Sequence, residues 1–285
     1  MLLLLYHSIT EVVSKLRAIM RRAMKHLTIV KMSSPGADRA ETNLLESLQK
    51  LRVTLDRPII AAIGGDGTML RAIKKHRTDD ALFVGISTGH LGFLQVVDSD
   101  KIQELVEALA AKTYSLITAP MLHVRDKQDQ VLGYAFNDIS VERNGPRAAK
   151  FSVHIGQSIG SFIGDGVIFA TPLGSTAYSL AASGPIIDAE AEDVFVVTPN
   201  NPHISELYST LQRPHVLSRN RTVSIDFQQA EQEGRPVQLI VDGVVVQKKL
   251  TDSVRISLSD QKVHLIQLSQ RGFHDRIEAK RLGRS

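Results

Sequence analysis

The chain has 285 residues but contains no cysteine and no tryptophan, and only 5% of its residues are aromatic. Without cysteine the protein can form no disulfide, no thiolate nucleophile and no cysteine-ligated zinc site. The scarcity of aromatic rings leaves few surfaces on which single-stranded nucleic acid can stack its bases. We therefore expect no nucleic-acid partner, and the absence of cysteine is consistent with a cytoplasmic location.

Long apolar runs are also absent. The opening MLLLLY is broken by His7 and Ser8 and has no basic segment before it, so we interpret it as a buried strand and not as a signal peptide. No other uncharged apolar stretch approaches the roughly 20 residues that span a membrane. Because hydrophobic residues make up 43% and charged residues 22%, the composition is typical of a compact, water-soluble protein with no membrane partner.

The formal net charge is +4, and part of the excess lies in residues 15–25 and 276–284. Such positive charge attracts polyanions. Small anionic ligands such as nucleotides explain it as well as nucleic acid or acidic lipid does. The common nucleotide and metal motifs are missing, since there is no GxxxxGK[ST], no GxGxxG after a strand and no HExxH. Any phosphate site must therefore be built in another way.

The first 118 residues alternate short apolar runs with helix-like segments. Apolar residues repeat at three-to-four spacing over 10–27, and further helices are expected near 40–52, 68–77 and 99–112. Between them lie apolar runs such as PIIAAI and ALFVGI, and SSPGAD is interpreted as a turn. This alternation predicts an α/β domain whose parallel sheet is flanked by helices.

After Pro120 the pattern changes to short β-rich runs separated by Gly, Pro, Asn and Asp, which predicts a β-rich, mostly antiparallel domain. Only 175–183, 205–211 and a short segment near the C-terminus look helical there. We place an α/β domain at 1–118, a β-rich domain at 119–265, and a C-terminal segment at 266–285 that packs back on the first domain.

The stretch GGDGT at 64–68 follows the apolar run PIIAAI and precedes a predicted helix. Ligands of open α/β sheets bind at this carboxyl edge, where glycines let the backbone approach a phosphate and the helix N-terminus favours anions. An acid placed there must hold a metal ion, accept a ribose hydroxyl or remove a proton. The structural alternative is that Asp66 caps a helix that begins near Thr68.

A second acid between glycines, Asp165, begins the segment GDGVIFATPLGSTAYSL. An apolar strand there breaks into a loop whose Thr171, Ser175 and Thr176 offer hydroxyls and amides to an anion or a sugar. Tyr178 offers a ring face to a base. The alternative is an ordinary capped helix with Tyr178 in the core.

Two further features lie between these segments. The glycine-rich loop within 85–94 follows a strand, and its Phe93 is able to pack on a ligand or equally on the core. Asn137 and Asp138 end an apolar run with an amide beside a carboxylate. This pair suits hydrogen bonding to a carboxamide or a ribose diol, and it is also common in turns.

The order of the motifs is more specific than any one of them. GGDGT, TGHLGF, ND, GDGVIFATPLGSTAYSLAASGPI, TPNNPH and VDG follow one another between about residues 59 and 245. This series resembles the NAD kinase family, especially its bacterial members, and the segment around GSTAYSL is its most specific part. GGDGT alone is shared with lipid kinases of the diacylglycerol and sphingosine type.

The resemblance implies a kinase that transfers the γ-phosphoryl group of ATP to the 2′-hydroxyl of the adenosine ribose of NAD and so produces NADP. It implies that Mg²⁺ or another divalent cation accompanies ATP, with no tightly bound prosthetic group. It also implies an α/β N-terminal domain, a β-rich C-terminal domain and a homodimer or homotetramer. Two alternatives stay open: a lipid or sphingoid kinase that shares the GGDGT loop, and a non-catalytic module that senses NAD.

The resemblance assigns a role to single residues, beginning with Asp66 as the general base. The loop expected to bind phosphate consists of Gly64, Gly65, Gly67 and Thr68. The residues expected to bind NAD are Asp66, Gly67, Phe93, Asn137, Asp138, Arg147, Asp165, Thr176, Ala177, Tyr178, Ser179, Leu180 and Ala181. Among them, Asp165 is expected to reach the NAD of a neighbouring subunit.

Some positions depart from the family's pattern. Leu173 stands where threonine is usual, and Ser183 stands where glycine is usual. Asn200 and Asn201 replace a more apolar pair, and Val244 follows VDG where a polar residue is frequent. These departures concern affinity for the phosphate donor and the dinucleotide more than the type of reaction.

Overall fold

The computed structural model describes residues 26–89, 92–203, 211–247, 250 and 252–268. The strand and helix expected before residue 26 and the helix expected near the C-terminus lie outside the described residues. The same holds for nearly all of the helix expected at 205–211 and for most of the segment 266–285. Within the described part, no helix is both long and apolar enough to cross a membrane.

The chain forms two compact units, of which the first comprises 1–117 with 263–285 and the second comprises 118–262. Two strands, β5 (Tyr114–Arg125) and β16 (Val254–Leu268), begin in one unit and end in the other. In the first unit, the strands β1 (Leu27–Lys31), β2 (Ile59–Ile63), β3 (Leu82–Ser87) and β4 (Val97–Asp98) pair in parallel, and the end of β16 pairs in parallel with β3.

The central strands β2 and β3 are buried along their whole lengths, as expected for parallel strands covered on both faces. Their register pairs Ile59 with Leu82 and Ile63 with Ile86, so both strands end at the same edge of the sheet. The loops that follow these two strands therefore leave the sheet next to each other.

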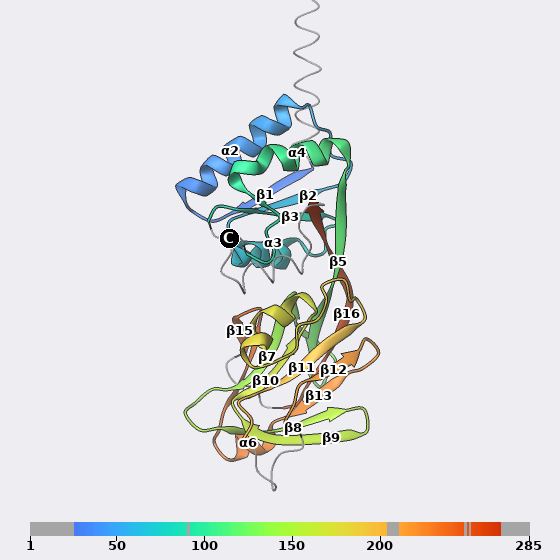
Figure 1. Ribbon diagram of the computed structural model, residues 1–285. Coiled ribbons are helices and arrows are strands. Elements are labelled where there is room, and N and C mark those ends of the chain that lie inside the picture. The colour runs from blue at the N-terminus through green and yellow to red at the C-terminus, as the bar shows by residue number, and fades with distance from the viewer. Residues whose placement is uncertain (1–25, 90–91, 204–210, 248–249, 251, 269–285) are drawn as a thin grey trace, which may run out of the picture. The chain divides into compact units, whose positions relative to one another are not determined.

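In the described part of this unit, the helices α2 and α4 cover one face of the sheet and α3 covers the other (Figure 1). Their apolar residues recur at helical spacing and turn inward, for example Leu105, Val106 and Leu109 in α4. The bounds of the helices are Pro35–Lys50 for α2, Asp66–His76 for α3 and Ile102–Ala111 for α4, the last preceded by the short 3₁₀ turn η1 (Ser99–Lys101).

The start of α2 corrects one sequence prediction. The Ser34 hydroxyl accepts the backbone N–H of Ala37 at 3.2 Å, and Pro35 occupies the first helical position. Proline is well tolerated there because the first N–H of a helix has no partner within it. The SSPGAD segment is therefore the start of the helix, and the predicted turn is wrong.

The second unit contains two antiparallel sheets whose inward side chains share one apolar core. The strands of one sheet, in spatial order, are β12 (His215–Ser218), β11 (Val194–Asn200), β10 (Gly166–Ala170), β7 (Asp138–Arg143), β14 (Val237–Val241) and β15 (Val244–Gln247). The other contains β16, β13 (Val223–Asp226), β8 (Ala149–Ile155) and β9 (Ser158–Gly164), with β5 and β6 (Val131–Ala135) alongside β16. The predicted fold class is confirmed in both units.

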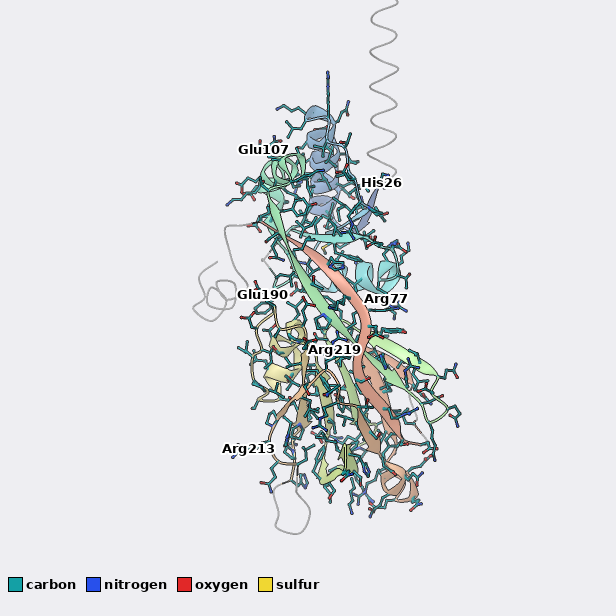
Figure 2. The ribbon with its side chains drawn as sticks, turned by 90° about the vertical axis from the view of Figure 1, so that its right-hand side faces the viewer. His26, Arg77, Glu107, Glu190, Arg213 and Arg219 are labelled. Carbon is teal, nitrogen blue, oxygen red and sulfur yellow. The ribbon has the colours of Figure 1, made fainter. Side chains whose placement is uncertain are left out.

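Strand β7 shows how the sequence alternation sets the two faces of its sheet. Ile139 and Val141 are fully buried in the core, so Asp138, Ser140 and Glu142 project from the opposite face. Elsewhere in this unit, Arg219 donates to the Asp193 carboxylate at 2.9 Å and to a backbone carbonyl of β16 at 3.2 Å; Figure 2 labels Arg219.

Helix is scarce among the described residues of the second unit, as the sequence predicts. The segment expected to be helical at 175–183 forms the 3₁₀ turn η2 (Leu173–Thr176) and the single turn α5 (Tyr178–Ala181). The sequence analysis missed α6 (Gln228–Gln232), whose five residues are too short to produce a clear periodicity.

Candidate active site

Asp66 is the first helical residue of α3, and Gly65 is the N-cap. No side chain caps this helix, so the alternative in which Asp66 serves only as a cap is wrong. The carboxylate turns instead to the loop after β3. Its Oδ2 accepts the backbone N–H of Phe93 at 3.1 Å, and its Oδ1 accepts that of Leu94 at 3.0 Å.

These two hydrogen bonds orient the Asp66 carboxylate and occupy only some of its acceptor positions. A carboxylate presents about four acceptor positions, two on each oxygen, and the amides occupy one on each. The side chain is half-buried, so a ligand at the sheet edge has access to it. Asp66 therefore retains acceptor positions beyond those that the two amides occupy.

The glycines around Asp66 differ in what a side chain at each position would meet. Gly64 has φ +149°, which L side chains rarely adopt, and a Cβ there would lie 2.5 Å from the Thr68 hydroxyl oxygen. A Cβ on Gly65 or Gly67 would meet no atom of the described residues within 4 Å. The backbone thus requires Gly64, whereas Gly65 and Gly67 border open space beside the acid.

In the second unit, Asn137 and Asp138 lie at the start of β7, where the backbone is held by one side chain. The Asp242 carboxylate accepts the N–H groups of Phe136, Asn137 and Asp138 at 2.9, 2.7 and 3.1 Å. The sequence analysis noted VDG only as one motif of a series and missed this role. The available signal was an Asp-Gly pair after an apolar run, which marks a hairpin turn.

Asp138 is a buried acid with only 6% of its surface exposed. Burial, followed by the negative charges of Asp242 and Glu142, raises the pKa of its carboxyl from 3.8 to about 7. At neutral pH a large fraction of the molecules therefore carries a proton on Asp138. This side chain is able to donate a hydrogen bond as well as accept one.

The loop after β10 is clamped onto Asn137. The Thr171 N–H donates to the Asn137 carbonyl at 2.9 Å, and a Cβ on Gly174 would lie only 1.9 Å from the same oxygen. No residue larger than glycine fits at 174 without moving the loop. The structure therefore brings the TPLGSTAY segment and the Asn-Asp pair together.

The hydroxyls of this loop are used within the loop and its neighbouring strand. Thr171 donates to the Phe136 carbonyl at 2.6 Å, Ser175 donates to the Pro172 carbonyl at 2.6 Å, and Thr176 donates to a carbonyl at 3.0 Å. They stabilise the turn, so these three hydroxyl protons are already donated to carbonyls, and binding of an anion or a sugar by this loop stays a prediction.

The stretch from Thr176 to Ala181 presents two kinds of side chain. Ser179 is fully buried, with its hydroxyl 2.9 Å from that of Thr198. Tyr178 and Leu180 are 38% and 42% exposed, and Ala177 and Ala181 are exposed as well. The alternative that places Tyr178 in the core is wrong, and its ring is accessible to a ligand.

The two asparagines that depart from the family's pattern have structural partners. Asn200 Nδ2 donates to the Tyr178 hydroxyl at 2.8 Å, and Asn201 Nδ2 donates to Asp165 at 3.2 Å. Partial burial, followed by hydrogen bonding to Glu142, raises the pKa of the Tyr178 hydroxyl to about 12. Tyr178 is therefore a neutral ring with a fixed orientation at neutral pH.

Asp165 precedes β10 and forms an ion pair with Arg143 at 2.5 Å. The hydrogen bond from Arg143 is the main reason that the pKa of Asp165 lies below its usual value. Asp165 adjoins Gly166, which pairs with Glu142, whereas Asp138 pairs with Ala170. The structure therefore places Asp165 at the opposite end of β7 from the Asn-Asp pair.

Arg147 is exposed on the loop that follows β7, beyond the same end as Asp165. It lines a cavity of about 190 Å³ with Gly145, Pro146 and the residues 234–236. The structure does not bring Arg147 to Asn137 within this unit, so its expected contact with the dinucleotide stays a prediction.

Comparisons with known proteins agree with the motif series. The model of the ATP-NAD kinase N-terminal domain matches residues 10–114, and that of the ATP-NAD kinase C-terminal domain matches residues 137–268. The NAD kinase of Sulfurimonas denitrificans is 32% identical over 229 residues, which cover 78% of this chain and 76% of that protein. The chain belongs to the NAD kinase family.

Another relative and two solved structures are also similar to the chain. The NAD kinase of Chlorobium limicola is 33% identical over 79% of this chain and 76% of its own length. A yeast NADH kinase complexed with NADH has a TM-score of 0.74 at 21% identity, covering 90% of this chain and 87% of its own. An Archaeoglobus fulgidus NAD kinase in complex with ATP has a TM-score of 0.71 at 22% identity, covering 90% and 98%. These structures share the fold.

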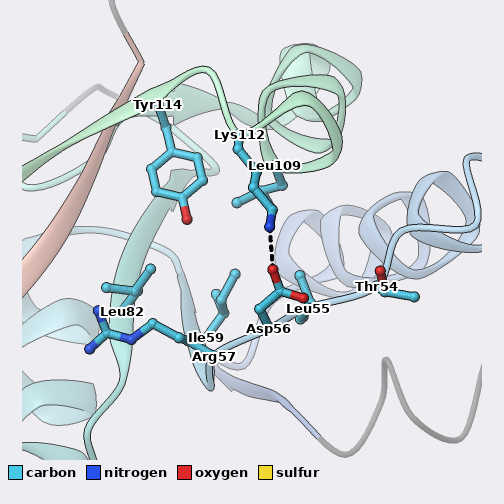
Figure 3. A pocket seen from close by; sticks show the side chains of 9 residues that line it. All are labelled: Thr54, Leu55, Asp56, Arg57, Ile59, Leu82, Leu109, Lys112 and Tyr114. Atoms are coloured by element: carbon cyan, nitrogen blue, oxygen red, sulfur yellow. Dashed lines mark hydrogen bonds and ion pairs between the residues drawn. The ribbon is translucent and has the colours of Figure 1, made fainter.

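A cavity of about 140 Å³ in the first unit lies away from the residues that match the NAD kinase family motifs (Figure 3). Ile59 and Leu82, the first residues of β2 and β3, line it, so it opens at the amino edge of the sheet. Asp66 lies after the carboxyl end of β2, at the opposite edge of the sheet. Beside the cavity, Lys112 forms an ion pair with Asp56.

Within the described residues, no three His, Cys, Asp or Glu side chains converge in a way that could hold a metal ion. Mg²⁺ often binds proteins through one or two carboxylates together with nucleotide phosphates, and we assign it no protein ligand.

Proposed function

We propose that this protein phosphorylates NAD, transferring the γ-phosphoryl group of ATP to the 2′-hydroxyl of the adenosine ribose, with Asp66 as general base. The observation that carries the proposal is the Asp66 carboxylate, held by the Phe93 and Leu94 amides at a glycine-lined sheet edge. Membership of the NAD kinase family supplies the reaction class. Neither a lipid kinase nor a non-catalytic sensor is favoured by the family match.

The acceptor hydroxyl is a weak nucleophile, and the phosphoryl group carries negative charge that repels it. Catalysis of this transfer consists mainly of alignment and neutralisation of charge. In the proposed step the ribose oxygen forms a bond to the γ-phosphorus, the bond from that phosphorus to the bridging oxygen breaks, and ADP leaves. The hydroxyl proton passes to Asp66, whose carboxylate retains free acceptor positions.

The residues of the phosphate loop contribute through space and backbone. Gly65 and Gly67 leave the area beside Asp66 free of side chains, and the N-terminus of α3 favours an anion. Arg71 on the same helix donates to the Thr68 hydroxyl at 3.3 Å, which places a positive charge near the loop. Mg²⁺, when bound with ATP, would neutralise part of the phosphate charge.

In the second unit, we assign dinucleotide binding to the Asn137–Asp138 pair and to the exposed stretch that contains Tyr178. Asn137 offers an amide, and Asp138 with its raised pKa offers either a donor or an acceptor to a ribose diol or a carboxamide. Tyr178 offers a neutral ring face to a base. Phe93, Asp165 and Arg147 remain proposed contacts on the family resemblance.

The test incubates the purified protein with NAD, ATP and Mg²⁺ and measures NADP. We expect NADP to form, and we expect Asp66→Asn to bind NAD while losing at least about two orders of magnitude in turnover. The matched control is Asp100→Asn, an exposed acid of the same unit, which should keep wild-type turnover. Near-normal turnover in Asp66→Asn would exclude it as the base.

The alternatives give different results in the same assay. An NAD-sensing module would bind NAD and form no NADP. A lipid kinase would instead transfer phosphate from ATP to diacylglycerol or sphingosine. The remaining expectations are also proposals: a divalent cation with ATP, a homodimer or homotetramer, and a cytoplasmic location.

A further inference from the structure

Gln95 is a fully buried polar side chain in the first unit that the proposed function does not use. Its exposed fraction is 0%, and neither Oε1 nor Nε2 has a hydrogen-bond partner among the described residues. Buried amides are nearly always paired. A carboxamide that leaves water on folding and gains no protein partner loses its hydrogen bonds to water, which destabilises the folded state. An unpaired carboxamide in such a place calls for a physical reason.

The contacts around Gly92 show that the Gln95 carboxamide lies close to the Asp66 carboxylate. A Cβ on Gly92 would lie 2.1 Å from Gln95 Oε1 and 2.2 Å from Asp66 Oδ1. Both oxygens therefore approach the same face of one glycine, and the carboxamide is a close neighbour of the Asp66 carboxylate. A residue larger than glycine at 92 would push one of them away.

The backbone on both sides of Gln95 is held by hydrogen bonds. The preceding residue, Leu94, donates its N–H to Asp66, and the following residue, Val96, donates its N–H to the Gly85 carbonyl at 2.9 Å. A Cβ on Gly85 would lie 2.9 Å from the Gln95 Cα, so the loop packs directly on β3. The same short segment thus carries the carboxylate's amide donors and the buried carboxamide.

A carboxamide presents an oxygen and an NH₂ group of nearly equal shape, and a half-turn about its last bond exchanges them. Two acceptor oxygens side by side repel each other, whereas an NH₂ group in that place is attracted to the carboxylate. We infer that Gln95 is a positioning residue for Asp66, whose Oδ1 accepts a hydrogen bond from the Gln95 carboxamide NH₂ in addition to the Leu94 amide.

This arrangement distinguishes the two oxygens of the proposed base. Oδ1 receives both the Leu94 N–H and the Gln95 NH₂, which fills its acceptor positions. Among the described residues, Oδ2 receives only the Phe93 N–H, so its remaining lone pair is the one available to the proton of the ribose hydroxyl. The inference rests on the proposed function, in which Asp66 removes that proton.

The test replaces Gln95 with methionine, which has nearly the same length and no N–H to donate. We expect kcat to fall at least about tenfold, because a base that is free to rotate is misaligned for part of the time. KM for NAD and for ATP should stay within about twofold of wild type. The control is Gln103→Leu, which removes an exposed glutamine of α4 that donates to Glu107 at 2.9 Å and should leave kcat unchanged.

A double-mutant cycle separates positioning from a general loss of structure. If Gln95 acts through Asp66, then Gln95→Met should have no further effect on the residual turnover of Asp66→Asn. An equal effect in both backgrounds, an unchanged kcat, or a rise in KM alone would overturn the inference. Should Gln95→Met fail to fold, Gln95→Glu preserves the size of the side chain and removes the donor when ionised, and the same comparison of kcat with KM decides.

The outcomes also distinguish this inference from the proposed function. An inactive Asp66→Asn together with a fully active Gln95→Met refutes the role of Gln95 alone. A fully active Asp66→Asn refutes the role of Asp66, and the positioning role of Gln95 is refuted with it.

Discussion

Asp242 and Asp138 are two acids held together by the fold. The Asp242 carboxylate accepts the backbone N–H of Asp138 at 3.1 Å, and its charge adds to the burial that raises the pKa of the Asp138 carboxyl to about 7. The bond orients the chain at the start of β7, while the charge favours the protonated form of Asp138. One side chain therefore orients the backbone of a residue proposed to bind NAD and also adds to the burial that raises the pKa of its carboxyl.

The raised pKa of Asp138 predicts a dependence of stability on pH. Between about pH 4 and 7 the folded protein retains a proton on Asp138 that the unfolded chain releases, so the free energy of unfolding falls as pH rises through this window. The slope from this group is about 1.4 kcal/mol per pH unit at most. Urea unfolding at pH 5, 6 and 7, followed by circular dichroism, should show that Asp138→Asn removes this part of the slope. An unchanged slope would contradict the raised pKa, and Asp100→Asn is the control.

The three N–H groups bound by Asp242 predict that Asp242→Asn weakens NAD binding. An asparagine offers one oxygen, and its NH₂ group would face donors, so at least one buried N–H loses its partner at a cost of about 1–3 kcal/mol. We expect lower thermal stability and at least about tenfold weaker NAD binding by calorimetry. Asp126→Asn is a suitable comparison, because Asp126 also accepts a backbone N–H, that of Gln130 at 2.8 Å. Equal effects of the two substitutions would argue against a special role of Asp242.

The glycines of the GGDGT loop predict two different phenotypes. Gly64→Ala forces an L residue to φ +149° and a Cβ against Thr68, so it should lower the free energy of unfolding by about 1–3 kcal/mol. The methyl group of Gly67→Ala meets no atom of the described residues within 4 Å, so the substitution should leave stability within about 0.5 kcal/mol of wild type. Its methyl group would occupy the space beside Asp66, so we expect kcat/KM to fall. Full activity of Gly67→Ala would show that this space is not used by a substrate.

Much of the fold could be predicted from the sequence because periodicity is a local property. The buried runs around Ile60 and Val84 and the helical spacing of Leu105, Val106 and Leu109 identified the parallel α/β part. Helix boundaries were less certain, as the start of α2 at Pro35 shows. A cap depends on which N–H groups a side chain reaches, and composition alone did not distinguish that start from a turn.

The sequence by itself determined the motif series and therefore the family, since both depend on the order of residues along the chain. Only the tertiary structure decided what Asp66 binds, because the Phe93 and Leu94 amides lie 27 and 28 residues away along the chain. The same holds for Asp242, whose three partners lie more than 100 residues earlier. Hydrogen bonds between loops that follow different strands depend on how those strands pair, and the pairing of distant segments is set by packing of the whole sheet.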